Sequence, residues 1–249
     1  MNEAEMLENA CADAWPALTD QPLGQWRLRA AAGFTGRANG ALAIGDPGTG
    51  VPRALKHACE FAHVHGIQPV AQVLDGSATE RAVAAAGWVH HEGHQAGYEV
   101  SVLLGPAEQP GATGSGVGGV SVAETPCAPW WELVAGTASP GRAQRHVLAG
   151  GTAPVGFATA RVGTETVGAA RGTVVGSLLH VARLTVVATH RRRGLGTVLM
   201  NGLGRWAARY GATRCVLQVE ANNTAALALY RGLGFTEHHR YRYWVPAKA

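Results

Sequence analysis

Three adjacent arginines and two closely spaced glycines form the segment of this chain best suited to bind a polyanion. Residues 190–196 read His-Arg-Arg-Arg-Gly-Leu-Gly, with a strand-like apolar run at 184–187 before them and a helical pattern at 194–210 after them. The glycines therefore lie at a strand-to-helix turn, where backbone N–H groups and the positive end of a helix dipole meet. Gly194 and Gly196 let the backbone approach a ligand closely because they lack a Cβ. This arrangement predicts a site for a pyrophosphate-like group.

A second segment carries an asparagine and a tyrosine on a predicted helix. Residues 223–235 read Asn-Thr-Ala-Ala-Leu-Ala-Leu-Tyr-Arg-Gly-Leu-Gly-Phe. With Arg191-x-x-Gly194-x-Gly196, this segment resembles the two signatures of the GNAT superfamily of N-acetyltransferases, over roughly residues 153–246. The resemblance implies the GNAT fold, a mixed α/β (α+β) fold in which helices flank a mostly antiparallel central sheet.

The same resemblance implies that acetyl-coenzyme A (acetyl-CoA) is the cosubstrate and that no metal is required. The loop amides would hold its pyrophosphate, and the preceding strand would pair with the pantetheine through its backbone. The strand amide near Val186 would donate to the oxyanion. The residues expected to form this site are Leu184, Thr185, Val186, Arg191, Arg192, Arg193, Gly194, Leu195, Gly196, Thr197, Asn223 and Tyr230.

Acyl transfer from a thioester to an amine needs a neutral amine, a stabilised oxyanion and a proton for the departing thiolate. By resemblance, Tyr230 protonates the thiolate or hydrogen-bonds the sulfur; the alternative is a tyrosine that only packs on a helix face. Asn223 by resemblance contacts the coenzyme, although capping its helix is an adequate explanation.

The general base is not indicated by a motif. Some relatives that acetylate protein N-termini carry Glu at the position of Gln218, and a neutral amide cannot accept a proton. Glu220 and His180 are the candidate substitutes, because both fall near strand ends that flank the expected cleft; a base acting through water would also suffice.

The amino-acid composition is typical of a folded enzyme. The chain has 249 residues, 47% hydrophobic and 15% charged, with a net charge of +4, so it is neither a solvated disordered chain nor a strong candidate for nucleic-acid binding. The first residues are acidic, and no apolar run reaches the roughly 18 residues of a membrane helix. We therefore expect a cytoplasmic protein without a membrane or nucleic-acid partner.

Four scattered cysteines without CxxC spacing are expected to be reduced thiols: Cys11, Cys59, Cys127 and Cys215.

A stretch rich in glycine and proline divides the chain. Residues 105–119 have the composition of a flexible linker, which predicts an N-terminal domain at 1–104 and a catalytic GNAT domain at 120–249. The stretch contains a formal GxGxxG at Gly114, Gly116 and Gly119, but no strand precedes it and no helix follows, so we reject a Rossmann site.

The C-terminal half shows alternating patterns: strands at 155–162, 213–220 and 235–245, one or two more strands within 172–187, and helices at 194–210 and 222–233. The N-terminal half repeats part of this order. Residues 70–73 parallel 216–219, a helix is expected at 52–65, and Gly87-Trp88 parallels Gly234-Phe235. The arginine-glycine loop is missing there, with Val83 and Gly76 at the places of Tyr230 and Asn223. This predicts a tandem GNAT protein whose N-terminal half is degenerate, and residues 26–39 and 238–243 resemble an actinobacterial group of two-part acetyltransferases.

Other clusters have weaker interpretations. The histidines at 90, 91 and 94 lie where neighbouring side chains point to opposite faces of a strand, so we expect no metal site. Trp130-Trp131 should begin a helix, on which Glu132 could anchor an amine or simply lie beside packed tryptophans.

The leading hypothesis is an acetyl-CoA-dependent N-acetyltransferase in which a primary amine attacks directly in a ternary complex. No cysteine is placed by a motif to carry the acetyl group. The alternative is a non-catalytic acyl-CoA-binding regulatory module, and a third reading is acylation of a mycothiol precursor. The sequence does not indicate the acceptor, small molecule or protein, or the oligomeric state.

Overall fold

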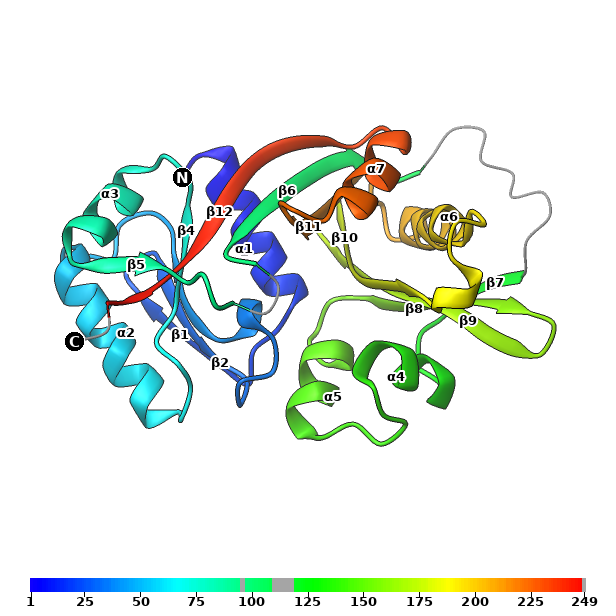
Figure 1. The fold of residues 1–249 in the computed structure, drawn as a ribbon, viewed down its shortest axis with the longest axis horizontal. Coiled ribbons are helices and arrows are strands. Elements are labelled where there is room, and N and C mark those ends of the chain that lie inside the picture. Colours follow the sequence, from blue (N-terminus) through cyan, green and yellow to red (C-terminus); the bar gives the residue numbers. More distant parts are fainter. Residues whose placement is uncertain (95–96, 109–118, 248–249) are drawn as a thin grey trace. The chain divides into compact units, whose positions relative to one another are not determined.

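The computed structural model describes residues 1–94, 97–108 and 119–247 (Figure 1). The predicted linker at 105–119 falls mostly on residues 109–118, which lie outside the described part. The chain forms two compact units, and neither is contiguous in sequence. Unit 1 comprises Met1–Val102, Gln218–Thr224 and Glu237–Ala249, and unit 2 comprises Leu103–Leu217 and Ala225–Thr236.

Unit 1 is built around a sheet that contains the last strand of the chain. Its strands follow the order β1-β2-β3-β4-β12, and β5 also pairs with β12; β3 and β4 are parallel, and the other pairs are antiparallel. Its elements are α1 (Glu3–Ala14), β1 (Thr19–Leu23), β2 (Trp26–Ala30), η1 (Gly36–Ala38), β3 (Gly40–Ala43), α2 (Val51–Val64), β4 (Ala71–Leu74), α3 (Ala78–Ala85), β5 (Trp88–His90) and β12 (Thr236–Pro246).

Helix α2 illustrates how the sequence specifies this unit. Its buried residues recur at helical spacing, so one face packs into the core: Ala54, Leu55, Ala58, Phe61 and Ala62. A proline lies in the first turn, and the chain turns away at Gly66, whose φ is +62°. The helix predicted at 52–65 is thus confirmed. The core it joins includes Trp26, Trp88 and Trp244.

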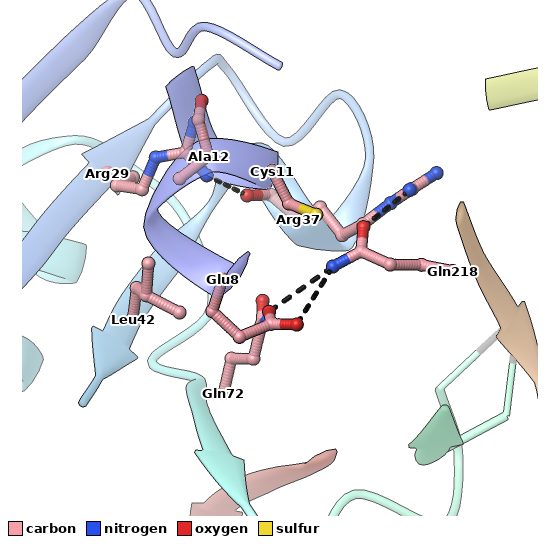
Figure 2. A pocket seen from close by; sticks show the side chains of 8 residues that line it. All are labelled: Glu8, Cys11, Ala12, Arg29, Arg37, Leu42, Gln72 and Gln218. Carbon is pink, nitrogen blue, oxygen red and sulfur yellow. Dashed lines mark hydrogen bonds between the residues drawn. The ribbon is translucent and has the colours of Figure 1, made fainter. Parts of the chain in front are cut away.

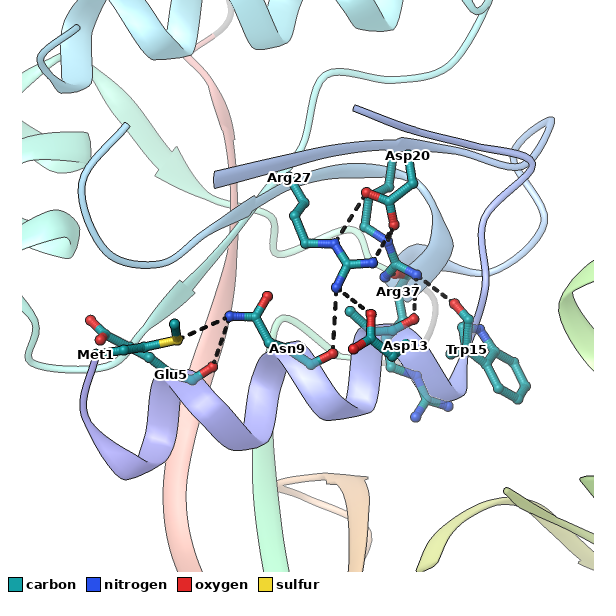
Figure 3. A network of polar contacts seen from close by, with 10 residues as sticks. Met1, Glu5, Asn9, Asp13, Trp15, Asp20, Arg27 and Arg37 are labelled. Atoms are coloured by element: carbon teal, nitrogen blue, oxygen red, sulfur yellow. Dashed lines mark hydrogen bonds and ion pairs between the residues drawn. The ribbon is translucent and has the colours of Figure 1, made fainter. Parts of the chain in front are cut away.

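Helix α1 is held by its own first turn and by arginines from β2. The Asn2 side chain accepts a hydrogen bond from the Glu5 backbone amide, and the Glu5 carboxylate accepts one from the Asn2 backbone amide. This reciprocal pair is a capping box. Arg27 bonds Asp13 at 2.7 Å and Asp20 at 2.6 Å (Figure 3). The buried Arg29 donates to the carbonyls of Ala12 and Trp15, where the helix ends. Burial lowers the pKa of Arg29 to about 10.

In unit 2, the strands follow the order β11-β10-β9-β8-β7 and pair antiparallel, except that β10 and β11 are parallel. Strands β6 and β11 contribute residues to both units. The elements are β6 (Glu99–Pro106), β7 (Gly119–Ala123), α4 (Ala128–Ala135), α5 (Arg142–Ala149), β8 (Val155–Val162), β9 (Glu165–Val175), β10 (Leu178–Val186), η2 (Ala188–His190), α6 (Leu195–Ala208), β11 (Arg214–Glu220) and α7 (Thr224–Gly232). The strand and helix order predicted for this half is confirmed.

Helix α6 packs closely on this sheet because glycines make room for its large side chains. A Cβ on Gly156 of β8 would lie 2.7 Å from the ring of Trp206, and one on Gly172 of β9 would lie 2.8 Å from Leu203. These contacts fix the helix whose first turn carries the arginine-glycine loop. In the described part of the chain, no helix is both long and apolar enough to cross a membrane.

Candidate functional site

Strand β10 contains a β-bulge just before the arginine-glycine loop. Its register with β9 steps from the pair Ala182–Arg171 to the pair Thr185–Ala169, so Arg183 and Leu184 lie opposite a single residue. Arg183 has a φ of +56°, which an L-residue rarely adopts. Such bulges bend a strand and are common next to active sites.

The other edge of β10 is only partly covered. It pairs in parallel with β11 from Leu178 to Val181, opposite Arg214 to Leu217. Beyond Val181, the described residues make no further ladder pair between these two strands. An extended ligand could therefore form backbone hydrogen bonds along this edge, as a peptide does when it adds to a sheet.

The loop after β10 makes the predicted strand-to-helix turn. Arg191 donates from Nε to the Val186 carbonyl at 3.1 Å, which anchors the loop to the strand. Gly194 is the N-cap of α6 with a φ of +77°, and nothing lies within 4 Å of the position its Cβ would take. No side chain of the described residues caps the helix, and Arg192 and Arg193 are exposed. The space beside the Gly194 backbone is therefore open, next to two cationic side chains at the N-terminus of α6.

Unit 2 brings the arginine-glycine loop together with residues 225–235 of the second signature. A Cβ on Gly196 would lie 2.9 Å from Leu229 on α7 and 3.7 Å from Leu184 on β10. The start of α6 therefore lies against both α7 and the bulged strand. Tyr230, the next residue on α7, is 7% exposed, and its ring lies 5.8 Å from that of Phe235.

The remaining residues predicted to bind the coenzyme lie at the end of β10, in the first turn of α6 and before α7. Thr185 and Val186 are half-buried at the end of β10 and pair with residues of β9. Leu195 is buried, and Thr197 is half-buried, in the first turn of α6. Asn223 precedes α7, and its amide donates to the Glu220 carbonyl at 3.0 Å, which closes the turn between β11 and α7.

The two predicted bases have different environments. His180 is 1% exposed in the middle of β10, where it pairs with Thr173 of β9 and Val216 of β11. Glu220 is half-buried at the end of β11 and packs on Gly97, whose Cβ would lie 2.6 Å from the carboxylate. Tyr230, His180 and the loop belong to unit 2, whereas Glu220 and Asn223 belong to unit 1.

Unit 1 also contains a buried polar cluster that the sequence interpretation missed. The carboxylate of Glu8 on α1 is 1% exposed and accepts hydrogen bonds from Gln72, from Gln218 at 3.2 Å and from His239 at 3.0 Å. Figure 2 shows the Gln218 amide between Glu8 and Arg37, whose Nη1 donates to it at 2.7 Å. The capping box of Asn2 and Glu5 was a signal for helix α1, but nothing local predicts the partners of Glu8.

An arginine and two tyrosines lie near this buried polar cluster. Arg37 lies over the Trp15 ring, 5.0 Å from its centroid, in a cation–π contact. Burial raises the pKa of both Tyr241 and Tyr243, so these phenols are neutral at physiological pH. Among the described residues, no group of three or more His, Cys, Asp or Glu could hold a metal ion.

Comparison with known proteins identifies the family. Residues 2–244 match the family model described as "Probable histone acetyltransferase Rv0428c C-terminal". The chain belongs to this family of GNAT acetyltransferases. Two curated relatives match shorter segments: an uncharacterized N-acetyltransferase, YobR, of Bacillus subtilis, 40% identical over 62 residues, and N-alpha-acetyltransferase 30 of Schizosaccharomyces pombe, 34% identical over 67 residues. These matches cover 24% and 26% of the chain, and 25% and 45% of the relatives' own lengths.

Solved structures share the fold over much more of the chain. A GCN5-related N-acetyltransferase from Kribbella flavida matches 100% of this chain and 97% of its own, with a TM-score of 0.72 and 17% identity. A tandem GNAT protein from the clavulanic acid biosynthesis pathway matches 79% of this chain and 70% of its own, with a TM-score of 0.59 and 19% identity. The mixed α/β GNAT fold predicted from the two signatures is confirmed.

Proposed function

We propose that the protein is an N-acetyltransferase that transfers the acetyl group of acetyl-CoA to a primary amine. The observation that carries this proposal is the meeting of three features in unit 2: the bulged end of β10, the open first turn of α6 and the helix that carries Tyr230. Family membership supports acyl transfer, and this geometry supports acetyl-CoA as the donor.

The turn supplies donors for a pyrophosphate. The first-turn amides of α6 have no partner within the helix and lie at the positive end of its dipole. Arg192 and Arg193 add charge, and Gly194 leaves space for the phosphate to reach the backbone. The edge of β10 beyond Val181 would pair with the amides of the pantetheine arm.

The acceptor nitrogen attacks the thioester carbonyl, and a water molecule takes up the proton that the nitrogen loses. The strand amide near Val186 stabilises the oxyanion, and the C–S bond breaks as Tyr230 gives a proton to the thiolate. Burial raises the pKa of the Cys215 thiol, which makes this cysteine a poor nucleophile and an unsuitable carrier of the acetyl group.

Calorimetric titration with acetyl-CoA tests the coenzyme site. Gly194→Glu places a carboxylate where the pyrophosphate approaches, so we expect at least a tenfold loss of affinity, or about 1.4 kcal/mol. Gly194→Ala is the matched control, since it has the same backbone strain at φ +77° without the charge. Unchanged affinity in the glutamate variant would overturn the loop assignment.

Turnover separates the enzyme from the alternative, a regulatory module that binds acyl-CoA without catalysis. Free coenzyme A release should be followed with three acceptor classes: peptides with a free N-terminus, peptides with an internal lysine, and small primary amines. Acetylation of any class supports the enzyme. Tight coenzyme binding with no turnover of any class would favour the module.

A further inference from the structure

Helix α7 ends in a turn that fixes the backbone of Tyr230 relative to that of Phe235. The Phe235 amide donates to the Tyr230 carbonyl at 3.0 Å, and the Gly234 amide donates to the Arg231 carbonyl at 3.0 Å. Gly234 has a φ of +78°, the left-handed conformation that glycine adopts most readily. These two hydrogen bonds and the left-handed glycine form a Schellman motif, a common C-terminal cap of helices. The spacing between Tyr230 and Phe235 is therefore set by the cap.

The cap also brings two aromatic rings together. In a Schellman motif, an apolar contact often joins the side chain after the left-handed residue to one on the last turn of the helix. The rings of Phe235 and Tyr230 have centroids 5.8 Å apart and planes tilted by 60°, a normal arrangement for an aromatic pair. Phe235 is 2% exposed and Tyr230 is 7% exposed. Because packed interiors leave few voids, a displaced Phe235 ring would also displace the ring of Tyr230.

A glycine of β6 makes room for the Phe235 ring. A Cβ on Gly105 would lie 2.8 Å from that ring, closer than Cβ atoms approach their neighbours in folded proteins. The φ of Gly105 lies outside the left-handed region, so this position requires the missing side chain and not a special backbone conformation. Composition assigns Gly105 to the flexible linker at 105–119, whereas the structure places it in β6 against Phe235.

The residue before Tyr230 is held by a different glycine. A Cβ on Gly196 would lie 2.9 Å from Leu229, so this contact joins α7 to the arginine-glycine loop, whereas Phe235 joins the end of α7 to β6. All these residues belong to unit 2. The contact of Phe235 with Gly105 can therefore be changed without altering a residue of the loop that we propose binds the pyrophosphate.

We propose that Phe235 is a positioning residue for Tyr230, and that its contact with Gly105 holds the phenol in the orientation from which it protonates the departing thiolate. This inference rests on the proposed function. Phe235 has no group that exchanges a proton, so it acts through Tyr230. Proton transfer needs the donor within hydrogen-bond reach of the acceptor, and a misplacement of about 1 Å can lower a rate about a hundredfold.

Gly105→Ala tests this role, because the three atoms nearest to the new methyl group all belong to the Phe235 ring. We expect kcat to fall about tenfold, and the affinity for acetyl-CoA to change by less than about twofold. Coenzyme A release with the amine class that the wild type acetylates gives kcat, and calorimetry gives the affinity. Gly119→Ala on β7 is the matched control, since nothing lies within 4 Å of its Cβ position.

The Tyr230→Phe background separates positioning from a general effect on the fold. No phenol proton remains to be positioned there, so adding Gly105→Ala should lower kcat by less than about twofold. A further tenfold loss in this background would overturn the inference and leave the proposed function intact, and so would a wild-type kcat in Gly105→Ala alone. A wild-type protein that acetylates no amine would overturn both.

Phe235→Leu provides a second variant if Gly105→Ala does not fold. The smaller side chain leaves space beside the Tyr230 ring instead of pushing on it, so the phenol loses its support in the opposite way. We expect the same loss of kcat with retained acetyl-CoA affinity, and the same absence of a further loss in the Tyr230→Phe background. A Phe235→Leu variant with wild-type kcat would contradict the positioning role.

Discussion

At the scale of single residues, Tyr230 decides whether the site is catalytic. Tyr230 lies on α7 next to Leu229, which lies 2.9 Å from the Cβ position of Gly196, and we propose that its phenol protonates the departing thiolate. We expect Tyr230→Phe to leave acetyl-CoA affinity unchanged and to lower kcat about a hundredfold, because only the proton is removed. Calorimetry measures the acetyl-CoA affinity, and steady-state kinetics measure kcat. A Tyr230→Phe variant with wild-type kcat would show that the phenol only packs against its neighbours.

Residue spacing predicted the strand-to-helix turn at Gly194 and Gly196 but not the buried polar cluster around Glu8. Gly194 and Gly196 were predictable because the local sequence, an apolar strand followed by a helical pattern, places both glycines at a strand-to-helix turn. The β-bulge at Arg183 could not be predicted from the sequence, because arginine has no preference for a positive φ. The tertiary structure imposes this backbone conformation. Glu8 was missed because its glutamine partners lie 64 and 210 residues away in sequence.

At the scale of elements, the packing of α6 on strands β8 and β9 holds the loop in place. Gly156→Val would push a branched side chain into the Trp206 ring, so we expect a loss of about 1–3 kcal/mol of unfolding free energy. Gly119→Val on β7 is the control, as nothing lies within 4 Å of its Cβ position. Urea unfolding of the two variants gives the difference, and equal stabilities would show that α6 has room to move.

Helices with a clear periodic pattern of apolar residues were predictable from the sequence. A helix that depends on tertiary contacts was not. The helices at 52–65, 194–210 and 222–233 were found within a few residues because an apolar face repeats along them. Helix α1 was missed, although its capping box is visible in the sequence, because its polar contacts with β2 and β12 are long-range. A short amphipathic segment needs such partners to be stable.

At the scale of the whole molecule, the compact units combine distant parts of the chain. The division at 104 that the linker composition suggests remains a prediction, and the fragment 1–104 tests it. This fragment lacks β12, which pairs with both β4 and β5. We expect it to unfold without cooperativity on heating. Fusing residues 237–247 to its end through a flexible linker should restore a cooperative transition, measured by circular dichroism. Cooperative unfolding of the unfused fragment would support the division at 104.

The place of β12 in unit 1 also bears on how the protein is made. A ribosome synthesises this strand after every other helix and strand, so the first half of the chain leaves the exit tunnel with the strand that should lie between its own elements still missing. Until then, β4 has an unpaired edge open to other nascent chains. A premature stop codon just before β12 should therefore damage the earliest-made part of unit 1, and a chaperone that shields that edge during translation would raise the yield of folded protein.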